Sequence, residues 1–144
     1  EILVDSLNYC IRRKGLQVFA YVIMTNHCHL IIQRNDGGRL SDLIRDLKRH
    51  TSKKIVQAIE DNGRESRRKW LLFLLKKDDG VWFWRAGYHG IEIKSARGLA
   101  NIIRYIHRNP VKAGIVVNES DYSYSSAADF AGIRRGPVPL ADFF

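Results

Sequence analysis

QVFAYVIMTNHCHLII, residues 17–32, holds two apolar runs separated by the polar pair Thr25-Asn26. Residues 17–24 predict one strand and residues 27–33 a second, and the short bend between them predicts a hairpin. The second run opens with two histidines on either side of Cys28. We take this hairpin as the centre of the fold, because the other long elements that the sequence predicts are helices, which pack on a sheet.

Helices are predicted on both sides of this hairpin. Apolar residues recur at helical spacing over residues 3–11, and Gly15 follows as a stop. A long amphipathic helix is predicted over residues 41–61. Another is predicted over residues 94–109, where Pro110 should halt it. Together with the hairpin these elements indicate an α+β protein.

The remaining segments are less clearly patterned. Residues 66–77 suit a buried helix or a strand, and VWFW at 81–84 predicts a further strand. With 144 residues, no internal repeat and no linker, the chain predicts one domain over 1–144. Within it, residues 115–144 are expected to form an irregular C-terminal extension.

The composition points to a nucleic-acid partner. The formal net charge is +9 and the pI is near 9.8, and a domain this basic most often meets a polyanion. A basic but merely solvated surface is the alternative. An apolar content of 45% excludes wholesale disorder. Two cysteines suggest a reducing compartment, and no run of about 20 apolar residues predicts a membrane span.

The histidine pair leaves three interpretations open: a zinc site that includes Cys28, a metal site without it, or ordinary strand histidines. Side chains alternate along a strand, so His27 and His29 should project to one side and Cys28 to the other. This geometry disfavours the zinc site with cysteine. The two imidazoles, about 6 to 7 Å apart along a strand, could converge on one ion, but the pair alone does not decide.

A third ligand and a reactive group are both available in the helix over residues 94–109. Tyr105 and Asn109 are four residues apart and therefore lie on one face, beside the apolar stripe. Five cations and no acid lie between Lys94 and Lys112, which favours a phosphate near the tyrosine. The basic residues that we expect to contact DNA lie on this helix and on the one over 41–61: Arg45, Lys48, Arg49, Lys53, Arg97, Arg104, Arg108 and Lys112.

Several segments together resemble one known family. YVIMTNHCHLII, followed some 75 residues later by YIHRNPVKAGIV, closely resembles the REP-associated tyrosine transposases of the HUH single-tyrosine group. GRLSDLIRDLKRHTSKKI, FWRAGYHGIEI and DYSYSSA also look like segments of this family. The resemblance runs from about residue 3 to residue 128.

The resemblance implies a fold and a set of site residues. It implies a ferredoxin-like antiparallel sheet with helices on one face, and a later helix that presents the nucleophilic tyrosine. By position, His27 and His29 match the metal ligands, Tyr105 matches the nucleophile, and Asn109 falls where the wider group places a third ligand. The family's first strand should precede the opening helix, so we expect it to be missing from this chain or to lie upstream of Glu1.

The activity that the resemblance implies is cleavage and strand transfer of single-stranded DNA through a 5′-phosphotyrosine. Two imidazoles and a carboxamide would suit Mg²⁺ or Mn²⁺, and the substrate would be palindromic, hairpin-forming repeats. The protein would act in a bacterial cytoplasm near the nucleoid, without a membrane and with a homodimer possible. Two rivals stay open: a non-catalytic basic DNA-binding module with structural histidines, and a metal-dependent hydrolase that uses water.

Overall fold

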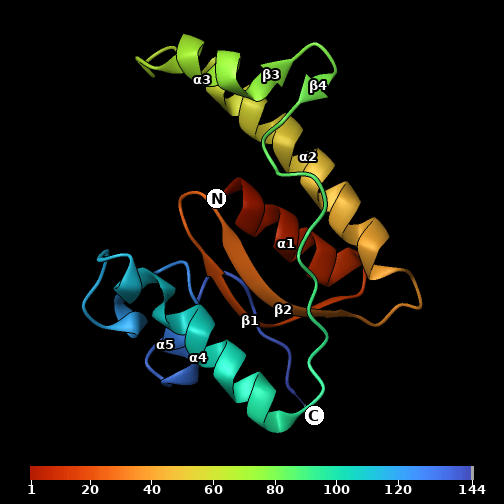
Figure 1. Cartoon of the computed structure of the whole chain (residues 1–144), viewed down its shortest axis with the longest axis vertical. Helices are drawn as coiled ribbons and strands as arrows, with labels where there is room; N and C mark the ends of the chain where they lie inside the picture. The colour runs from red at the N-terminus through yellow and green to blue at the C-terminus, as the bar shows by residue number, and fades with distance from the viewer. Residues whose placement is uncertain (144) are drawn as a thin grey trace. The chain divides into compact units, whose positions relative to one another are not determined.

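The computed structural model describes residues 1–143, and Figure 1 shows its elements in chain order. It divides into two compact units, one made of Glu1–Leu7 and Gly38–Gly90 and the other of Asn8–Gly37 and Ile91–Phe144. The elements are α1 (Ile2–Arg13), β1 (Leu16–Ile23), β2 (Cys28–Arg34), α2 (Leu40–Asp61), α3 (Arg68–Leu75), β3 (Lys76–Lys77), β4 (Gly80–Val81), α4 (Ala96–Lys112), a 3-10 turn η1 (Glu119–Asp121) and α5 (Ala127–Phe130). The α+β prediction is confirmed.

The predicted hairpin is present and antiparallel. In its register Val22 lies opposite His29 and Ile23 opposite Cys28. The ladder shifts between Val18 and Ala20, so one extra residue of β1 is accommodated there. His27 lies just before β2 rather than within it, and the hairpin therefore carries the histidines at the end where its two strands are joined.

Gly15 makes the turn from α1 into β1. Its φ is +62°, in the left-handed region that glycine adopts without strain. A Cβ at this position would lie 2.7 Å from the Cβ of Asp36 and 2.8 Å from Oδ1 of Asn35. Any other residue would therefore push the start of β1 away from the loop that follows β2.

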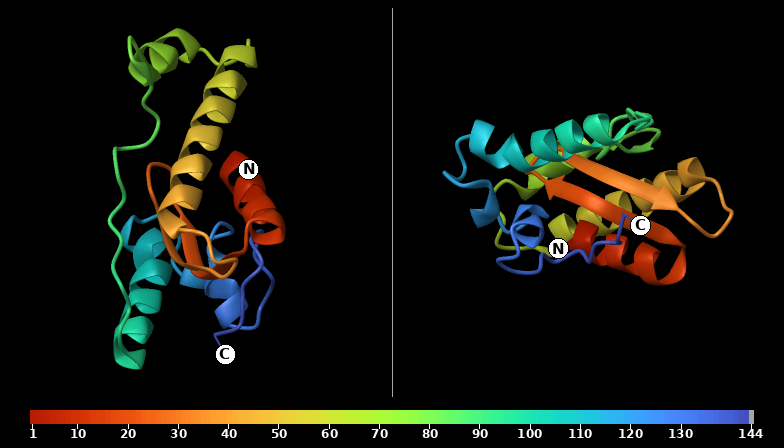
Figure 2. Two further views of the ribbon diagram at one scale, coloured as in Figure 1. Left: turned by 90° about the vertical axis from the view of Figure 1, so that its right-hand side faces the viewer. Right: turned by 90° about the horizontal axis from the view of Figure 1, so that it is seen from below.

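Helix α4 packs on one face of the hairpin, as Figure 2 shows. Ile106 is 2% exposed and joins a core with Ala20, Val22 and Ile31 of the two strands. Half-buried apolar side chains from the earlier turns of α4 extend this contact: Leu99, Ile102 and Ile103. Burial of Ile106 fixes the rotation of α4, and hence the side to which its neighbour Tyr105 points.

The prediction that Pro110 ends this helix is wrong, because α4 continues to Lys112. Proline lacks the N–H that would bond the carbonyl of Ile106. The side chain of Asn109 lies at this gap: its Nδ2 donates to the Tyr105 carbonyl at 2.8 Å and lies 3.5 Å from that of Ile106. Only one backbone hydrogen bond is lost, in the last turn, and the helix therefore continues past Pro110.

The C-terminal extension of 115–144 pairs with the outer edge of β1. The backbone N–H of Ile23 donates to the Tyr124 carbonyl at 2.8 Å, and that of Ser126 donates to the Tyr21 carbonyl at 3.0 Å. Farther along, the N–H of Ala141 donates to the Val18 carbonyl at 2.7 Å. Besides forming η1 and α5, this segment thus satisfies an edge of β1 that would otherwise be open. Phe144, its last residue, lies outside the described part of the chain.

Tyr21 is the largest fully buried side chain of this unit. Its burial predicts that the protein loses folding stability at alkaline pH. Burial raises the pKa of its phenol to about 12, whereas an unfolded tyrosine titrates near 10. The unfolded chain therefore loses this proton first, and stability falls as the pH rises from 10 to 12, by about 2 to 3 kcal/mol. Urea unfolding at pH 8 to 12 should show this slope, and Tyr21→Phe should flatten it. An equal slope in both proteins would contradict the burial argument.

The other unit contains α2, α3 and the short β3–β4 hairpin. Helix α2 spans nearly the predicted range and buries Leu43, Ile44, Leu47 and Val56. The ambiguous segment 66–77 is mainly helical, as α3. The strand predicted for 81–84 is wrong, because β4 ends at Val81. Trp84 instead donates its Nε1–H to Oγ1 of Thr51 in α2, at 2.8 Å.

None of the helices in residues 1–143 is long and apolar enough to cross a membrane. The prediction of a single domain stays a prediction.

Candidate functional site

Four residues predicted for the site come together where β2 begins beside α4. The rings of His27 and His29 are 5.2 Å apart, centre to centre, and so are those of His29 and Tyr105. Nε2 of His27 lies 3.5 Å from Oδ1 of Asn109. Residues separated by more than 70 positions in the sequence thus form one cluster, held in place by the packing of α4 on the hairpin.

The hydrogen bonds around His27 fix which of its nitrogens is free. Oδ1 of Asn26 lies 2.6 Å from Nδ1 of His27, and a carboxamide oxygen can only accept, so Nδ1 donates. In the neutral ring Nε2 then carries a lone pair. It faces Oδ1 of Asn109, which is also an acceptor because Nδ2 of that residue is occupied with the Tyr105 carbonyl. Two acceptors that face one another favour a cation between them.

The donor set fits a hard divalent cation. Neighbouring ligands of an octahedral ion lie about 3 Å apart when each bond is about 2.1 Å, close to the 3.5 Å between Nε2 of His27 and Oδ1 of Asn109. No three His, Cys, Asp or Glu side chains within residues 1–143 are grouped so that they could hold a metal. A site at the histidine pair therefore needs a ligand of another type, which Asn109 offers.

His29 and Cys28 differ in what they can offer a metal. Burial, and to a smaller extent the nearby His27, lower the pKa of His29, so its ring is neutral at pH 7 and keeps a lone pair. Burial raises the pKa of the Cys28 thiol, which therefore stays protonated and is a poor ligand. The interpretation with Cys28 as a zinc ligand is thus disfavoured on chemistry as well as geometry.

Tyr105 is accessible from solvent and has a cation against it. Its side chain is 48% exposed, and Nζ of Lys112 lies 5.2 Å from the centre of its ring. Alongside it on α4 runs a basic stripe of exposed side chains: Arg97, Arg104, Arg108 and Lys112. Helix α4 contains no acid, and within residues 1–143 none of these four cations is paired with one. An anionic ligand would meet the tyrosine and this charge together.

The DNA-contacting residues predicted on α2 belong to the other unit. Arg49 and Lys53 are exposed. Arg45 is paired with Asp42 at 2.9 Å and Asp46 at 3.2 Å. The ammonium of Lys48 donates to the carbonyls of Arg85 and Gly87 at 2.5 Å each, so it connects α2 to the segment around residues 85–87.

Two further tyrosines, Tyr122 and Tyr124, lie in the C-terminal extension. The hydroxyl of Tyr122 donates to the Ile23 carbonyl at 2.8 Å. Tyr124 is 37% exposed, and its ring contact is with Tyr122 rather than with a histidine. Neither has the histidine and lysine neighbours that Tyr105 has.

Sequence reasoning missed one functional residue and part of the role of another. Asn26 orients His27, and the only sequence indication was a polar residue next to it in the bend. Lys112 was predicted to contact DNA, but its position over the Tyr105 ring depends on how the last turn of α4 continues past Pro110. No periodicity could have shown either contact.

Comparison with known proteins gives two findings. A family model described as "Transposase IS200 like" matches residues 1–109. A solved structure, "Structure of the REP associates tyrosine transposase bound to a REP hairpin", is similar with a TM-score of 0.67 and 20% sequence identity, over 100% of this chain and 74% of that one. At this identity the likeness supports the fold. None of the curated proteins compared matches the chain in sequence.

Proposed function

Because this chain belongs to the family of IS200-like transposases, we propose that it cuts and rejoins single-stranded DNA through a 5′-phosphotyrosine on Tyr105. The observation that carries the proposal is the cluster itself. An exposed tyrosine lies against His29, and Nε2 of His27 lies 3.5 Å from Oδ1 of Asn109. The proposed nucleophile therefore lies against one of the proposed metal ligands.

Each site residue has a step that its geometry permits. The Tyr105 oxygen attacks the scissile phosphorus while its proton passes to water. The bond from phosphorus to the 3′ oxygen breaks, and that oxygen takes up a proton from water and leaves as a free 3′-hydroxyl. The new phosphotyrosine ester retains the energy of the broken bond, so a second 3′-hydroxyl can reverse the step and join strands. Lys112 and the basic stripe of α4 offset the negative charge of the phosphate. This reversibility is the chemical reason for a tyrosine in place of an activated water.

We assign His27, His29 and Asn109 as the ligands of Mg²⁺ or Mn²⁺. When bound, such an ion would polarise a non-bridging phosphate oxygen and orient the phosphate for in-line attack. The chain's own contribution is the arrangement of ligands. Asn26 holds the His27 tautomer, burial keeps His29 neutral, and the Tyr105 carbonyl holds the Asn109 amide so that its oxygen points to His27.

We propose DNA hairpins with palindromic repeats as the substrate. The similar solved transposase is described as bound to a REP hairpin. The exposed cations of α4 supply the charge that a phosphate backbone requires. The site itself does not distinguish DNA sequences, because its proposed ligands act on the phosphate and do not contact the bases.

The test is a covalent adduct that can be mapped to one residue. The protein is mixed with single-stranded hairpin oligonucleotides labelled at either end, in Mn²⁺ or in EDTA. A denaturing gel should show a shifted band that carries the DNA downstream of the cut, and only with metal. Trypsin should release the adduct on the peptide 105–108, which contains a single tyrosine. Metal-dependent cleavage without an adduct would indicate a hydrolase, and hairpin binding without cleavage a DNA-binding module.

Loss of one cation from α4 should weaken hairpin binding in a salt-dependent way. For Arg108→Gln, the slope of log affinity against log salt should become shallower by about 0.7 to 1, because about one phosphate contact is lost. Filter binding in EDTA from about 50 to 300 mM salt measures the slope. Arg135→Gln, an exposed arginine outside α4, should leave the slope unchanged. Equal slopes for both variants would remove α4 from the DNA interface.

A further inference from the structure

Helix α3 and the β3–β4 hairpin carry large aromatic side chains in solvent. Residues 64–85 contain five aromatic residues among 22, including all three tryptophans of the chain. Phe73 is 79% exposed, Trp70 57% and Trp82 45%. None of the residues of α3 is buried. Clusters of exposed apolar side chains are typical of surfaces that bind a partner or ligand.

The exposed aromatics of α3 lie on one side of the helix. Trp70, Phe73 and Leu74 are three and four residues apart, which places them on one face. The half-buried residues Leu71, Leu72 and Leu75 take the opposite face, and α3 contacts α2 of the same unit. Helix α3 therefore has a half-buried leucine face and a second face that exposes Trp70, Phe73 and Leu74 to solvent.

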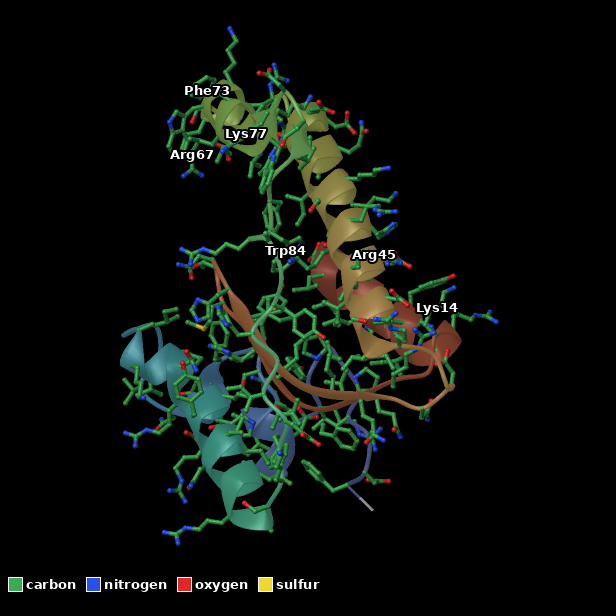
Figure 3. The ribbon with its side chains drawn as sticks, turned by 45° about the vertical axis from the view of Figure 1, so that its right-hand side comes forward. Lys14, Arg45, Arg67, Phe73, Lys77 and Trp84 are labelled. Carbon is green, nitrogen blue, oxygen red and sulfur yellow. The ribbon has the colours of Figure 1, made fainter. Side chains whose placement is uncertain are left out.

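Positive charge is interleaved with these rings. Residues 64–85 hold seven cations and three acids, a net charge of +4. Nζ of Lys77 lies 5.7 Å from the centre of the Trp82 ring. Within residues 1–143, neither Lys69 nor Lys77 is paired with an acid, whereas Arg67 is paired with Glu65 at 3.1 Å. Figure 3 labels Phe73, Arg67 and Lys77 around α3 and β3.

We propose that this aromatic–basic surface, formed by Lys69, Trp70, Phe73, Lys77 and Trp82, binds unpaired single-stranded DNA by stacking bases on its rings. The proposal rests on the proposed function in taking DNA as the ligand. Stacking on aromatic groups within a positively charged surface is how proteins hold single strands without reading their sequence. The surface gives this transposase a second DNA contact, directed to unpaired bases, besides the phosphate-directed cluster at Tyr105.

Charge and the pattern of the helix faces disfavour the two other occupants. A second copy that presented the same face would bring +4 against +4, which disfavours association. A helix that lies in a membrane surface has a strongly charged face opposite its apolar one, whereas the face of α3 opposite Trp70 and Phe73 consists of half-buried leucines. The negative charge of a DNA strand matches the lysines, and its bases match the rings.

Tryptophan fluorescence can report on this surface, because two of the chain's three tryptophans, Trp70 and Trp82, belong to it. Trp84 is half-buried and hydrogen-bonded to Thr51 of α2, so Trp84→Phe leaves only the two tryptophans of the surface. The full chain carrying Trp84→Phe and Tyr105→Phe is titrated in EDTA with an oligothymidylate of about 20 nucleotides. No cleavage can occur, and the probe has no hairpin.

We expect saturable quenching, with a Kd that weakens about tenfold or more in Trp82→Leu and in Trp70→Leu. Trp82→Phe, which keeps a ring, should retain most of the affinity, and this separates stacking from misfolding. Tyr9→Leu removes an aromatic residue that is 53% exposed on α1 and should change nothing. A blunt DNA duplex should bind the Leu variants and their parent equally, because its bases are not free to stack.

Three results would overturn the surface proposal. The first is an unchanged Kd in both Leu variants. The second is a blue shift with anionic lipid vesicles but no response to oligothymidylate, which would make the surface a membrane contact. The third is self-association in sedimentation that the Leu variants abolish, which would make it a dimer interface. Adduct formation on a short hairpin by the chain with wild-type Tyr105 tests the proposed function separately, so each proposal can fail alone.

Discussion

Replacing Tyr105 with phenylalanine should abolish the covalent protein–DNA adduct and lower cleavage by at least about 10³-fold. The substitution removes the attacking oxygen and nothing else. The phenyl ring can keep its contact with His29, 5.2 Å between centres, and its place beneath Lys112. The backbone carbonyl that orients Asn109 is also unchanged. Folding and hairpin affinity in EDTA should therefore equal those of the wild type.

The matched control for this variant is Tyr124→Phe. Tyr124 is also partly exposed and lies in the same unit, but its ring contact is with Tyr122. It should form the adduct at the wild-type rate. If Tyr105→Phe cleaved as fast as the wild type, the nucleophile would be water and the enzyme a hydrolase. If Tyr124→Phe alone lost the adduct, the nucleophile would be in the C-terminal extension and not on α4.

Replacing His27 with alanine should have the second largest effect, a loss of at least about 100-fold in metal affinity and in cleavage. The imidazole Nε2 faces Oδ1 of Asn109 at 3.5 Å, and no other side chain takes its place in the cluster. His27 is exposed, so its loss opens no cavity in the core. Titration calorimetry with Mn²⁺ measures the affinity, and the labelled-hairpin assay measures the rate at a saturating and a low metal concentration.

His50→Ala provides the control for the metal experiment. His50 is an exposed histidine of α2, so its removal takes away an imidazole of similar accessibility without touching the cluster. It should bind Mn²⁺ like the wild type. Excess metal should partly restore cleavage in His27→Ala, because the remaining ligands still bind weakly. Equal Mn²⁺ affinity in all three proteins would show that His27 is not a ligand.

The sequence by itself determined the local geometry of the site. Alternation along a strand predicted that His27 and His29 project to one side, and the helical repeat predicted that Tyr105 and Asn109 lie on one face. The hairpin and the long helices were predictable because each follows from the spacing of neighbouring residues. A weak local pattern gave a wrong prediction at residues 81–84. These residues have the composition of a strand, but the side chain of Trp84 donates a hydrogen bond to Thr51 of α2.

Only the tertiary structure decided that these pieces form one site. Burial of Ile106 among Ala20, Val22 and Ile31 sets the rotation and depth of α4, and this brings Tyr105 to His29 across 76 positions of sequence. The continuation of α4 past Pro110 puts Lys112 over the tyrosine ring. The exposure of Trp70 and Phe73 on α3 was likewise not predictable, because an apolar run does not reveal which of its aromatic side chains will be buried. Periodicity describes neighbours along the chain, whereas contacts between distant segments depend on how whole elements pack.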